Sequence, residues 1–246
     1  MEYLFSEYSD IIVNRKGLVK DSHMQTTKVI GNIKPNKTYT INPDNLKSCK
    51  KELTKNIKNI VKEPLYTKIK NNWDCVPKHV DEGSNILGNN GEFQINGNLT
   101  IPIVTATIEH LAFYNCMLIE QYDNIQFDTP KEIPVTVMQI GSNYAKDYLL
   151  TEMGGGCYLE YHDVPHFHMP LNDQSIGYLI LGKIIDENCC LTAFKIPYGY
   201  AIYTSPYTIH CDAFLVGDYI VAYTVTDNYS TVLLKNNGAI VGVEFY

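Results

Sequence analysis

A histidine-rich stretch in the second half of the chain constrains the fold most strongly. Residues 154–218 hold four of the seven histidines, namely His162, His166, His168 and His210. Alternate side chains of a β-strand point to the same face. If residues 157–168 form one extended strand, Glu160 and three of these histidines therefore share a face. His162 then lies roughly 13 Å from His166 at ~3.3 Å per residue, too far to share a metal ion unless Pro165 kinks the strand.

Short strand-like segments dominate the chain from about residue 99 onward. Runs of β-branched and aromatic residues alternate with turn residues such as Gly, Pro, Asn and Asp. The strands that we expect cover residues 99–105, 133–140, 157–168, 177–185, 190–196, 200–209, 219–226, 231–235 and 240–246. Two helical segments are expected at about 107–120 and 144–152. So many short strands at this spacing predict an all-β barrel or sandwich.

The first part of the chain has a different pattern. Short β-like pieces at 11–13, 28–33 and 38–41 precede a predicted amphipathic helix, which begins near Asn42 and ends at Pro64. Glycine and asparagine then cluster between residues 83 and 97, which is typical of loops. We therefore predict an N-terminal basic α/β segment over residues 1–95 and a β-barrel over residues 96–246.

Charge is distributed unevenly along the chain. Residues 1–80 carry 15 basic against 8 acidic side chains, and the remaining residues carry 5 against 19. Such asymmetry can indicate nucleic-acid binding. Arg15 is the only arginine, however, and bidentate recognition of phosphate or guanine depends on arginine. We therefore expect the lysines to solvate a helix or to attract the acidic part, and we do not expect a nucleic-acid partner.

The cysteines and the chain start indicate a reducing compartment. Seven cysteines without a Cys-x-x-Cys pair favour neither a disulfide framework nor a thiolate zinc site. The first residues lack the basic and apolar regions of a secretory signal. No apolar run approaches the ~18 residues of a membrane span. We expect a cytoplasmic protein without a membrane partner.

Two short motifs carry a family resemblance. In the first, Gly156 precedes His166-Phe167-His168, and a strand over 176–182 ends in glycine. In the second, Gly199 is followed by Pro206 and His210 and then by Gly217-Asp218. Together they resemble the two metal-binding motifs of the cupin superfamily. The resemblance covers about residues 150–230 and implies a cupin-like double-stranded β-helix barrel with one divalent metal inside.

The same resemblance implies a ligand set. It assigns His166 and His168 of the first motif and His210 of the second as metal ligands. Gln174 stands near the position of the family's glutamate, so this residue or Asp173 completes the set. A glutamine in place of a glutamate lowers the site charge by one. The implied cofactor is a divalent transition metal, Fe²⁺ first, with Mn²⁺, Ni²⁺ or Zn²⁺ as alternatives.

Two further residues are catalytic candidates. Glu160 is a candidate general base if it faces the cavity and burial raises its pKa. Tyr207 is a candidate hydroxyl donor in the cavity. The candidate residues also allow a purely structural interpretation. Buried histidines can simply make hydrogen bonds, and most tyrosines belong to the core. A cupin barrel without a metal therefore remains an alternative.

Three classes of function follow, each acting on or binding a small molecule. An iron-dependent dioxygenase ranks slightly first, because a site without the family's glutamate becomes a three-histidine site. A metal-dependent sugar or sugar-phosphate isomerase or epimerase is the second class, although few basic residues flank the barrel to hold a phosphate. The third is a non-catalytic binding or structural protein. The resemblance also suggests a homodimer.

Overall fold

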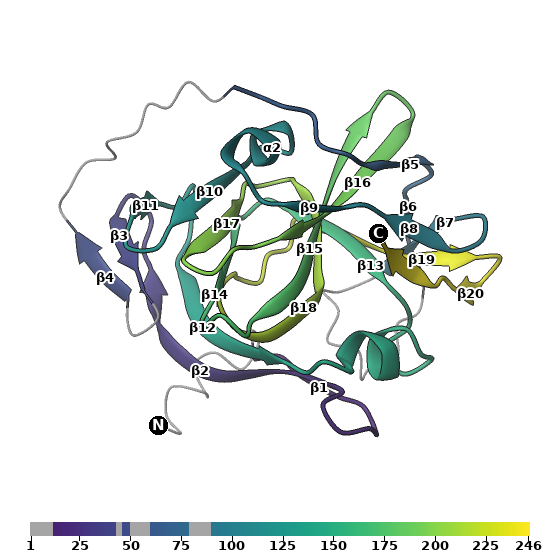
Figure 1. Cartoon of the computed structure of the whole chain (residues 1–246), viewed down its shortest axis with the longest axis horizontal. Helices are drawn as coiled ribbons and strands as arrows, with labels where there is room; N and C mark the ends of the chain where they lie inside the picture. Colours follow the sequence, from purple (N-terminus) through teal and green to yellow (C-terminus); the bar gives the residue numbers. More distant parts are fainter. Residues whose placement is uncertain (1–11, 43–45, 50–59, 79–89) are drawn as a thin grey trace.

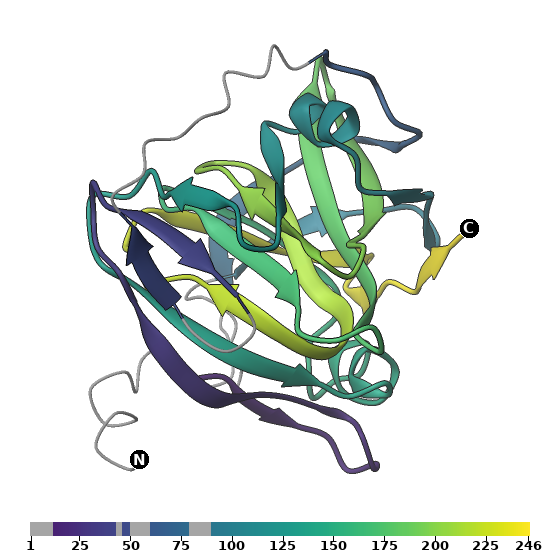
Figure 2. The ribbon, with the colours of Figure 1, turned by 60° about the vertical axis from the view of Figure 1, so that its left-hand side comes forward.

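The protein is a mainly β structure in which one strongly curled antiparallel sheet forms a half-barrel (Figures 1 and 2). This computed structural model describes residues 12–42, 46–49, 60–78 and 90–246. None of the helices in these ranges is both long and apolar enough to cross a membrane.

The long strand β18 (Ile209–Ala222) connects the two halves of the curled sheet. Its first half pairs with β15, ending at the Ile176–Val216 pair, and its second half pairs with β12, beginning at the Ile140–Gly217 pair. The change of partner therefore falls at Gly217, whose φ of 105° is unfavourable for residues with a side chain. The Ser175 hydroxyl holds this bend by donating to the Asp218 carbonyl at 2.7 Å.

The first half of the sheet runs in the order β1-β2-β12-β18-β14-β17-β10, and all of its pairs are antiparallel. Its other strands are β1 (Asn14–Lys16), β2 (His23–Ile33), β10 (Cys116–Glu120), β12 (Ile133–Ile140), β14 (His166–Pro170) and β17 (Tyr200–Thr204). A small sheet of β11 (Asn124–Gln126), β3 (Thr38–Ile41) and β4 (Leu46–Cys49) lies beside it.

The second half contains β15 and β16 on one side of β18 and β13 and β19 on the other. Its strands are β13 (Tyr158–His162), β15 (Ile176–Ile185), β16 (Asn188–Lys195) and β19 (Tyr229–Asn236), with β5 (Thr67–Lys70), β6 (Asp74–Lys78), β7 (Asn90–Gln94), β9 (Ile103–Thr105) and β20 (Ala239–Ile240) at the edges. Separately, β21 (Val243–Phe245) pairs in parallel with β8 (Leu99–Ile101).

Two apolar clusters fill the structure. The larger packs inside the curled sheet and includes Leu179, Leu181 and Phe194. The smaller lies between the first half of the curled sheet and the β11-β3-β4 sheet. Phe167 and Met169 of β14 belong to this smaller cluster, so the histidines that alternate with them face the other side of the strand.

Most of the strands predicted from the sequence are present, but three segments differ. Residues 157–168 form two strands, β13 and β14, instead of one. The helix expected over 107–120 is only α2 (Ile108–Phe113), capped by the Thr107 hydroxyl, and Cys116–Glu120 is a strand. Asn115 ends the helix with a φ of 59°, a left-handed conformation that asparagine tolerates. The segment expected to be helical at 144–152 contains a short π-helix, η2 (Ala145–Leu149).

The predicted mixed α/β character of the N-terminal segment is not present in the described residues, where all regular elements before residue 96 are strands. Residues 43–45 and 50–59 of the predicted helix lie outside the described part of the chain. The expected beginning of this helix, Leu46–Cys49, is instead β4, which pairs with β3 in a hairpin. Tyr39 and Ile41 are buried at alternate positions of β3, which agrees with the β-like pattern predicted over residues 38–41.

The division at residue 95 stays a prediction. Strands from both sides of it are hydrogen-bonded to one another: β2 pairs with β12, β5 with β16, and β7 with β19.

Substituting Gly217 tests the importance of the bend in β18. A Cβ added at Gly217 would lie 2.8 Å from Ser175 Cα, whereas one added at Gly238, which also has a positive φ, meets nothing within 4 Å. We expect Gly238→Ala to lower the free energy of unfolding by about 1 kcal/mol through backbone strain alone, and Gly217→Ala by about 3 kcal/mol. Urea denaturation measures both, and equal losses would contradict the account of the bend.

Candidate metal centre

The short link between β13 and β14 brings His162 next to His166. Residues 163–165 break the predicted single strand, so His162 ends one strand and His166 begins the next. The two imidazole rings lie 4.6 Å apart between centroids, instead of the roughly 13 Å of a straight strand. The His162 carbonyl also accepts a hydrogen bond from the Tyr207 amide at 2.7 Å, which ties the link to the turn after β17.

The sheet adds Glu160 and His210 to this pair. Glu160 of β13 and His210 of β18 are directly paired across the antiparallel ladder, so their side chains share a face. His210 Nε2 lies 3.4 Å from Glu160 Oε1. The His210 ring lies 5.0 Å from that of His162 and 4.7 Å from that of His166, between centroids.

These four side chains form a cluster that fits a single metal ion. One potential ligand atom from each of Glu160, His162, His166 and His210 lies within 4.8 Å of the corresponding atom of every other member. Bonds of about 2.0–2.2 Å place the ligand atoms of a tetrahedral site roughly 3.3–3.6 Å apart, so any pair near the 4.8 Å limit would have to close by about 1 Å around an ion. All four residues are buried, with between 1% and 6% of their surface exposed.

The ring nitrogens of the cluster are the feature that a metal would explain. His162 Nδ1 is hydrogen-bonded to the Val164 carbonyl oxygen at 2.6 Å, and His210 Nδ1 is hydrogen-bonded to the Thr208 carbonyl oxygen at 2.9 Å. These contacts fix the two rings and direct each Nε2 to the cluster, as outer-shell partners do in metal sites. His162 Nε2, His210 Nε2 and His166 Nδ1 are buried without a hydrogen-bond partner. Each buried nitrogen without a partner costs about 1–3 kcal/mol.

The environment keeps two of the histidines neutral near pH 7. Burial lowers the pKa of His162 to about 4, with a further contribution from His210. Burial and the neighbouring histidines hold the pKa of His166 well below its ordinary value. Burial alone would lower the pKa of His210, but the Glu160 carboxylate, whose Oε1 lies 3.4 Å from His210 Nε2, outweighs burial and raises this pKa. A metal ion needs neutral imidazoles, so the site is prepared for one at His162 and His166.

His168, a predicted ligand, is outside this group of four and pairs with Asp212. Its Nε2 lies 3.3 Å from Asp212 Oδ2, and Tyr158 donates its hydroxyl proton to Asp212 Oδ1. Burial alone would raise the pKa of Asp212. The hydrogen bond and charge interaction between His168 and Asp212 outweigh burial and hold the pKa of Asp212 well below its usual range. The His168 ring lies 5.4 Å from that of His166, between centroids, so this pair adjoins the cluster.

The structure places the remaining predicted site residues at the surface. Gln174 is exposed in the turn before β15, where its backbone N–H donates a hydrogen bond to Asn172 Oδ1 at 2.9 Å. The neighbouring Asp173 is exposed in the same turn. Tyr207 is 58% exposed, and its hydroxyl accepts a hydrogen bond from Asn228 Nδ2 at 3.1 Å. The cluster thus includes Glu160, His166 and His210 from the predicted residues and adds His162.

One sequence signal could have indicated His162. Asp163-Val164-Pro165 follows it directly, and proline has no N–H to donate to a strand ladder, so it commonly lies where a strand ends. A break there is the condition under which His162 approaches His166. Placing the Glu160 carboxylate in the cluster requires knowing that Glu160 pairs with His210 across neighbouring strands. No local sequence pattern reveals that pairing.

Comparisons with known proteins assign no family to the chain. No protein-family model, no curated protein and no solved structure matches it.

Replacing His166 with leucine separates a metal role from a structural role. The substitution removes a buried nitrogen without a partner, so we expect the metal-free protein to unfold with unchanged or up to ~1 kcal/mol higher free energy. Phe167→Leu on the other face of β14 should instead cost about 1 kcal/mol through lost packing. Urea denaturation in the presence of a chelator measures both. A loss above 2 kcal/mol for His166→Leu would indicate that packing or hydrogen bonding holds this ring.

The depressed pKa values also predict the pH dependence of stability without metal. His162 titrates near 6.5 when unfolded and near 4 when folded, so its stabilising contribution is complete above pH 6.5 and declines as the pH falls toward 4. We expect His162 to contribute a loss of about 2 kcal/mol between pH 7 and pH 5, partly offset by the raised pKa of His210. Denaturation of chelated protein at both pH values measures it.

The matched comparison uses His166→Leu, in which the decline should be smaller, because one histidine with a depressed pKa is removed. An identical decline in the two proteins would mean that the acid sensitivity arises elsewhere.

Proposed function

We propose that the protein binds one divalent transition metal through His162, His166, His210 and Glu160. The observation that supports this most strongly is the convergence of buried ring nitrogens without partners on one carboxylate. Three imidazoles and one carboxylate give the ion's environment a charge of −1. That donor set suits Fe²⁺ and Mn²⁺, and imidazole also suits Ni²⁺ and Zn²⁺. Fe²⁺ is our first candidate.

We further propose that the curled sheet is a cupin-like barrel. The supporting features are the two motifs, the curled antiparallel half-barrel and a buried histidine and glutamate cluster on β13, β14 and β18. The proposed ligand set departs from the one that the motifs imply. Glu160 supplies the carboxylate in place of Gln174, and His162 takes the position expected for His168.

Replacing Gln174 by Glu160 in the ligand set changes the ranking of the two proposed reactions. The dioxygenase ranked first because glutamine in place of glutamate left three neutral histidines. With Glu160 in the proposed set, that reason no longer holds, and a dioxygenase and a sugar isomerase or epimerase are equally supported. In the isomerase a bound ion would act as a Lewis acid, and in the dioxygenase it would supply the redox chemistry that activates O₂. Glu160 would serve as a ligand, so a separate general base would be required.

Metal content tests the proposal. Protein purified without added metal should carry about one transition-metal ion per chain by elemental analysis, and His166→Leu and His210→Leu should carry none. His23→Gln is the matched control, because His23 is partly buried and its ring Nε2 lies 3.3 Å from Gln139 Oε1, away from the four cluster residues. An empty site that also takes up no Fe²⁺, Mn²⁺, Ni²⁺ or Zn²⁺ would overturn the proposal.

Two more variants distinguish the ligand sets. We expect His162→Gln to lose the metal and His168→Gln to retain it. The reverse pattern would support the motif-derived set of His166, His168, Gln174 and His210. For the metal-loaded protein, oxygen uptake with iron would favour the dioxygenase, and anaerobic sugar conversion with manganese or zinc would favour the isomerase.

A further inference from the structure

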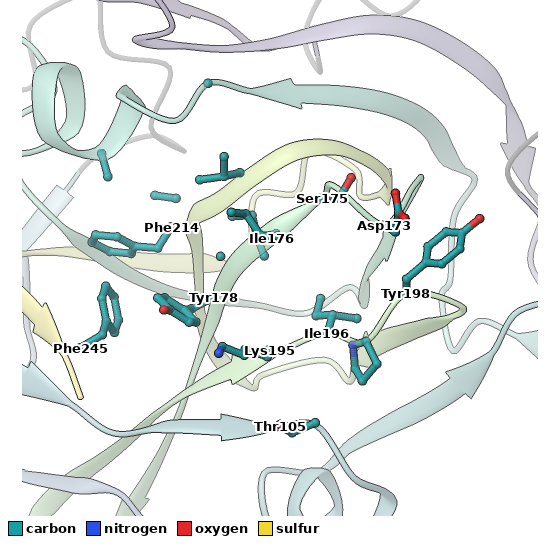
Figure 3. A pocket seen from close by; sticks show the side chains of 17 residues that line it. Thr105, Asp173, Ser175, Ile176, Tyr178, Lys195, Ile196, Tyr198, Phe214 and Phe245 are labelled. Atoms are coloured by element: carbon teal, nitrogen blue, oxygen red, sulfur yellow. The ribbon is translucent and has the colours of Figure 1, made fainter.

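A second candidate site lies away from the metal cluster, in a pocket of about 680 Å³ (Figure 3). It is formed by the start of β15, the bend of β18, the end of β16 and the turn that follows β16. None of the four cluster residues lines it. A pocket of this size matches those that hold small organic ligands, which are typically ~300–1,000 Å³.

Three aromatic rings form one side of this pocket. The Phe245 ring packs against Tyr178 at 4.7 Å and against Phe214 at 5.0 Å, between centroids. Figure 3 shows these three side chains together, with Ile176 and Ile196 completing the apolar surface. Flat aromatic surfaces favour a planar ring, because stacked and edge-on contacts add to the burial of apolar area.

Lys195 provides a cation at the same side. Its ammonium lies on the side of Tyr178 in Figure 3, and it has no hydrogen-bond or ion-pair partner within the described residues. Asp173 lies on the opposite side of the pocket beside Tyr198. A ligand with one anionic group therefore fits best with that group at Lys195, and a second anionic group near Asp173 would be repelled.

We propose that this pocket binds a small monocarboxylic acid with a planar apolar ring. The ring packs against Tyr178, Phe214 and Phe245, and the carboxylate pairs with the Lys195 ammonium. The proposal does not depend on the metal site, because the two sets of residues are separate.

Three probes of one shape and different charge test the ligand class. They are 2-naphthoate, the neutral 2-naphthalenemethanol and the cationic 2-naphthylmethylammonium, each titrated into the full chain by calorimetry. We expect saturable binding at one site per chain, with the carboxylate tightest and the cation weakest. No saturable binding of any probe, or preference for the cation, would overturn the proposal.

Variants locate the binding. Lys195→Met should weaken 2-naphthoate about threefold and leave the neutral probe unchanged, since Lys195 is exposed and its ion pair with the carboxylate is partly screened by solvent. Lys34→Met, which removes an exposed lysine in the turn after β2, should change neither affinity. Phe245→Ala should weaken all three probes. An equal effect of Lys195→Met on the charged and neutral probes, or no effect of Phe245→Ala, would contradict the proposed site.

The thermal unfolding of each variant is the control for folding. Ile176→Trp provides a second test that does not remove a wall of the pocket, because Ile176 is 61% exposed and a larger side chain there should block entry. We expect this variant to unfold like the parent protein and to bind none of the probes. Binding unchanged in Ile176→Trp would place the probes elsewhere.

Discussion

The burial of four polar side chains on one face of the curled sheet is the constraint that explains the site. Three histidines and one glutamate lie in the interior, and one ring nitrogen of each histidine lacks the hydrogen-bond partner that buried polar groups normally have. Such an arrangement lowers stability, and it persists only because the surrounding core is extensive and apolar. Two of the histidines are also held neutral by that burial. A bound metal ion would remove this cost, so the cluster is a candidate metal centre.

The long strand β18 organises both candidate sites. Its first half positions His210 opposite Glu160, and its second half pairs with β14, which carries His166. The bend at Gly217 lets one strand serve both halves of the sheet. The pocket of Figure 3 lies along the residues before this bend, next to the start of β15. The same strand thus supports a buried polar cluster and a separate apolar pocket.

Sequence patterns predicted the β class and most strands because alternation and turn residues are local signals. They also predicted that Glu160, His166 and His210 belong near a site. The prediction of one continuous strand from alternating residues was wrong at Asp163-Val164-Pro165. The strand breaks there, and the His162 ring lies beside the His166 ring. Alternation could not reveal the pairing of Glu160 with His210, because that contact joins residues fifty positions apart. The motif spacing pointed to Gln174, which the structure places at the surface.

The most direct test of the metal centre is anomalous X-ray diffraction from crystals of the protein loaded with Fe²⁺ or Mn²⁺. The account predicts one strong anomalous peak about 2.0–2.3 Å from a ring nitrogen of each of His162, His166 and His210 and from a Glu160 oxygen. A peak bound instead by His168 and Asp212, or no peak in the interior of the sheet, would contradict it.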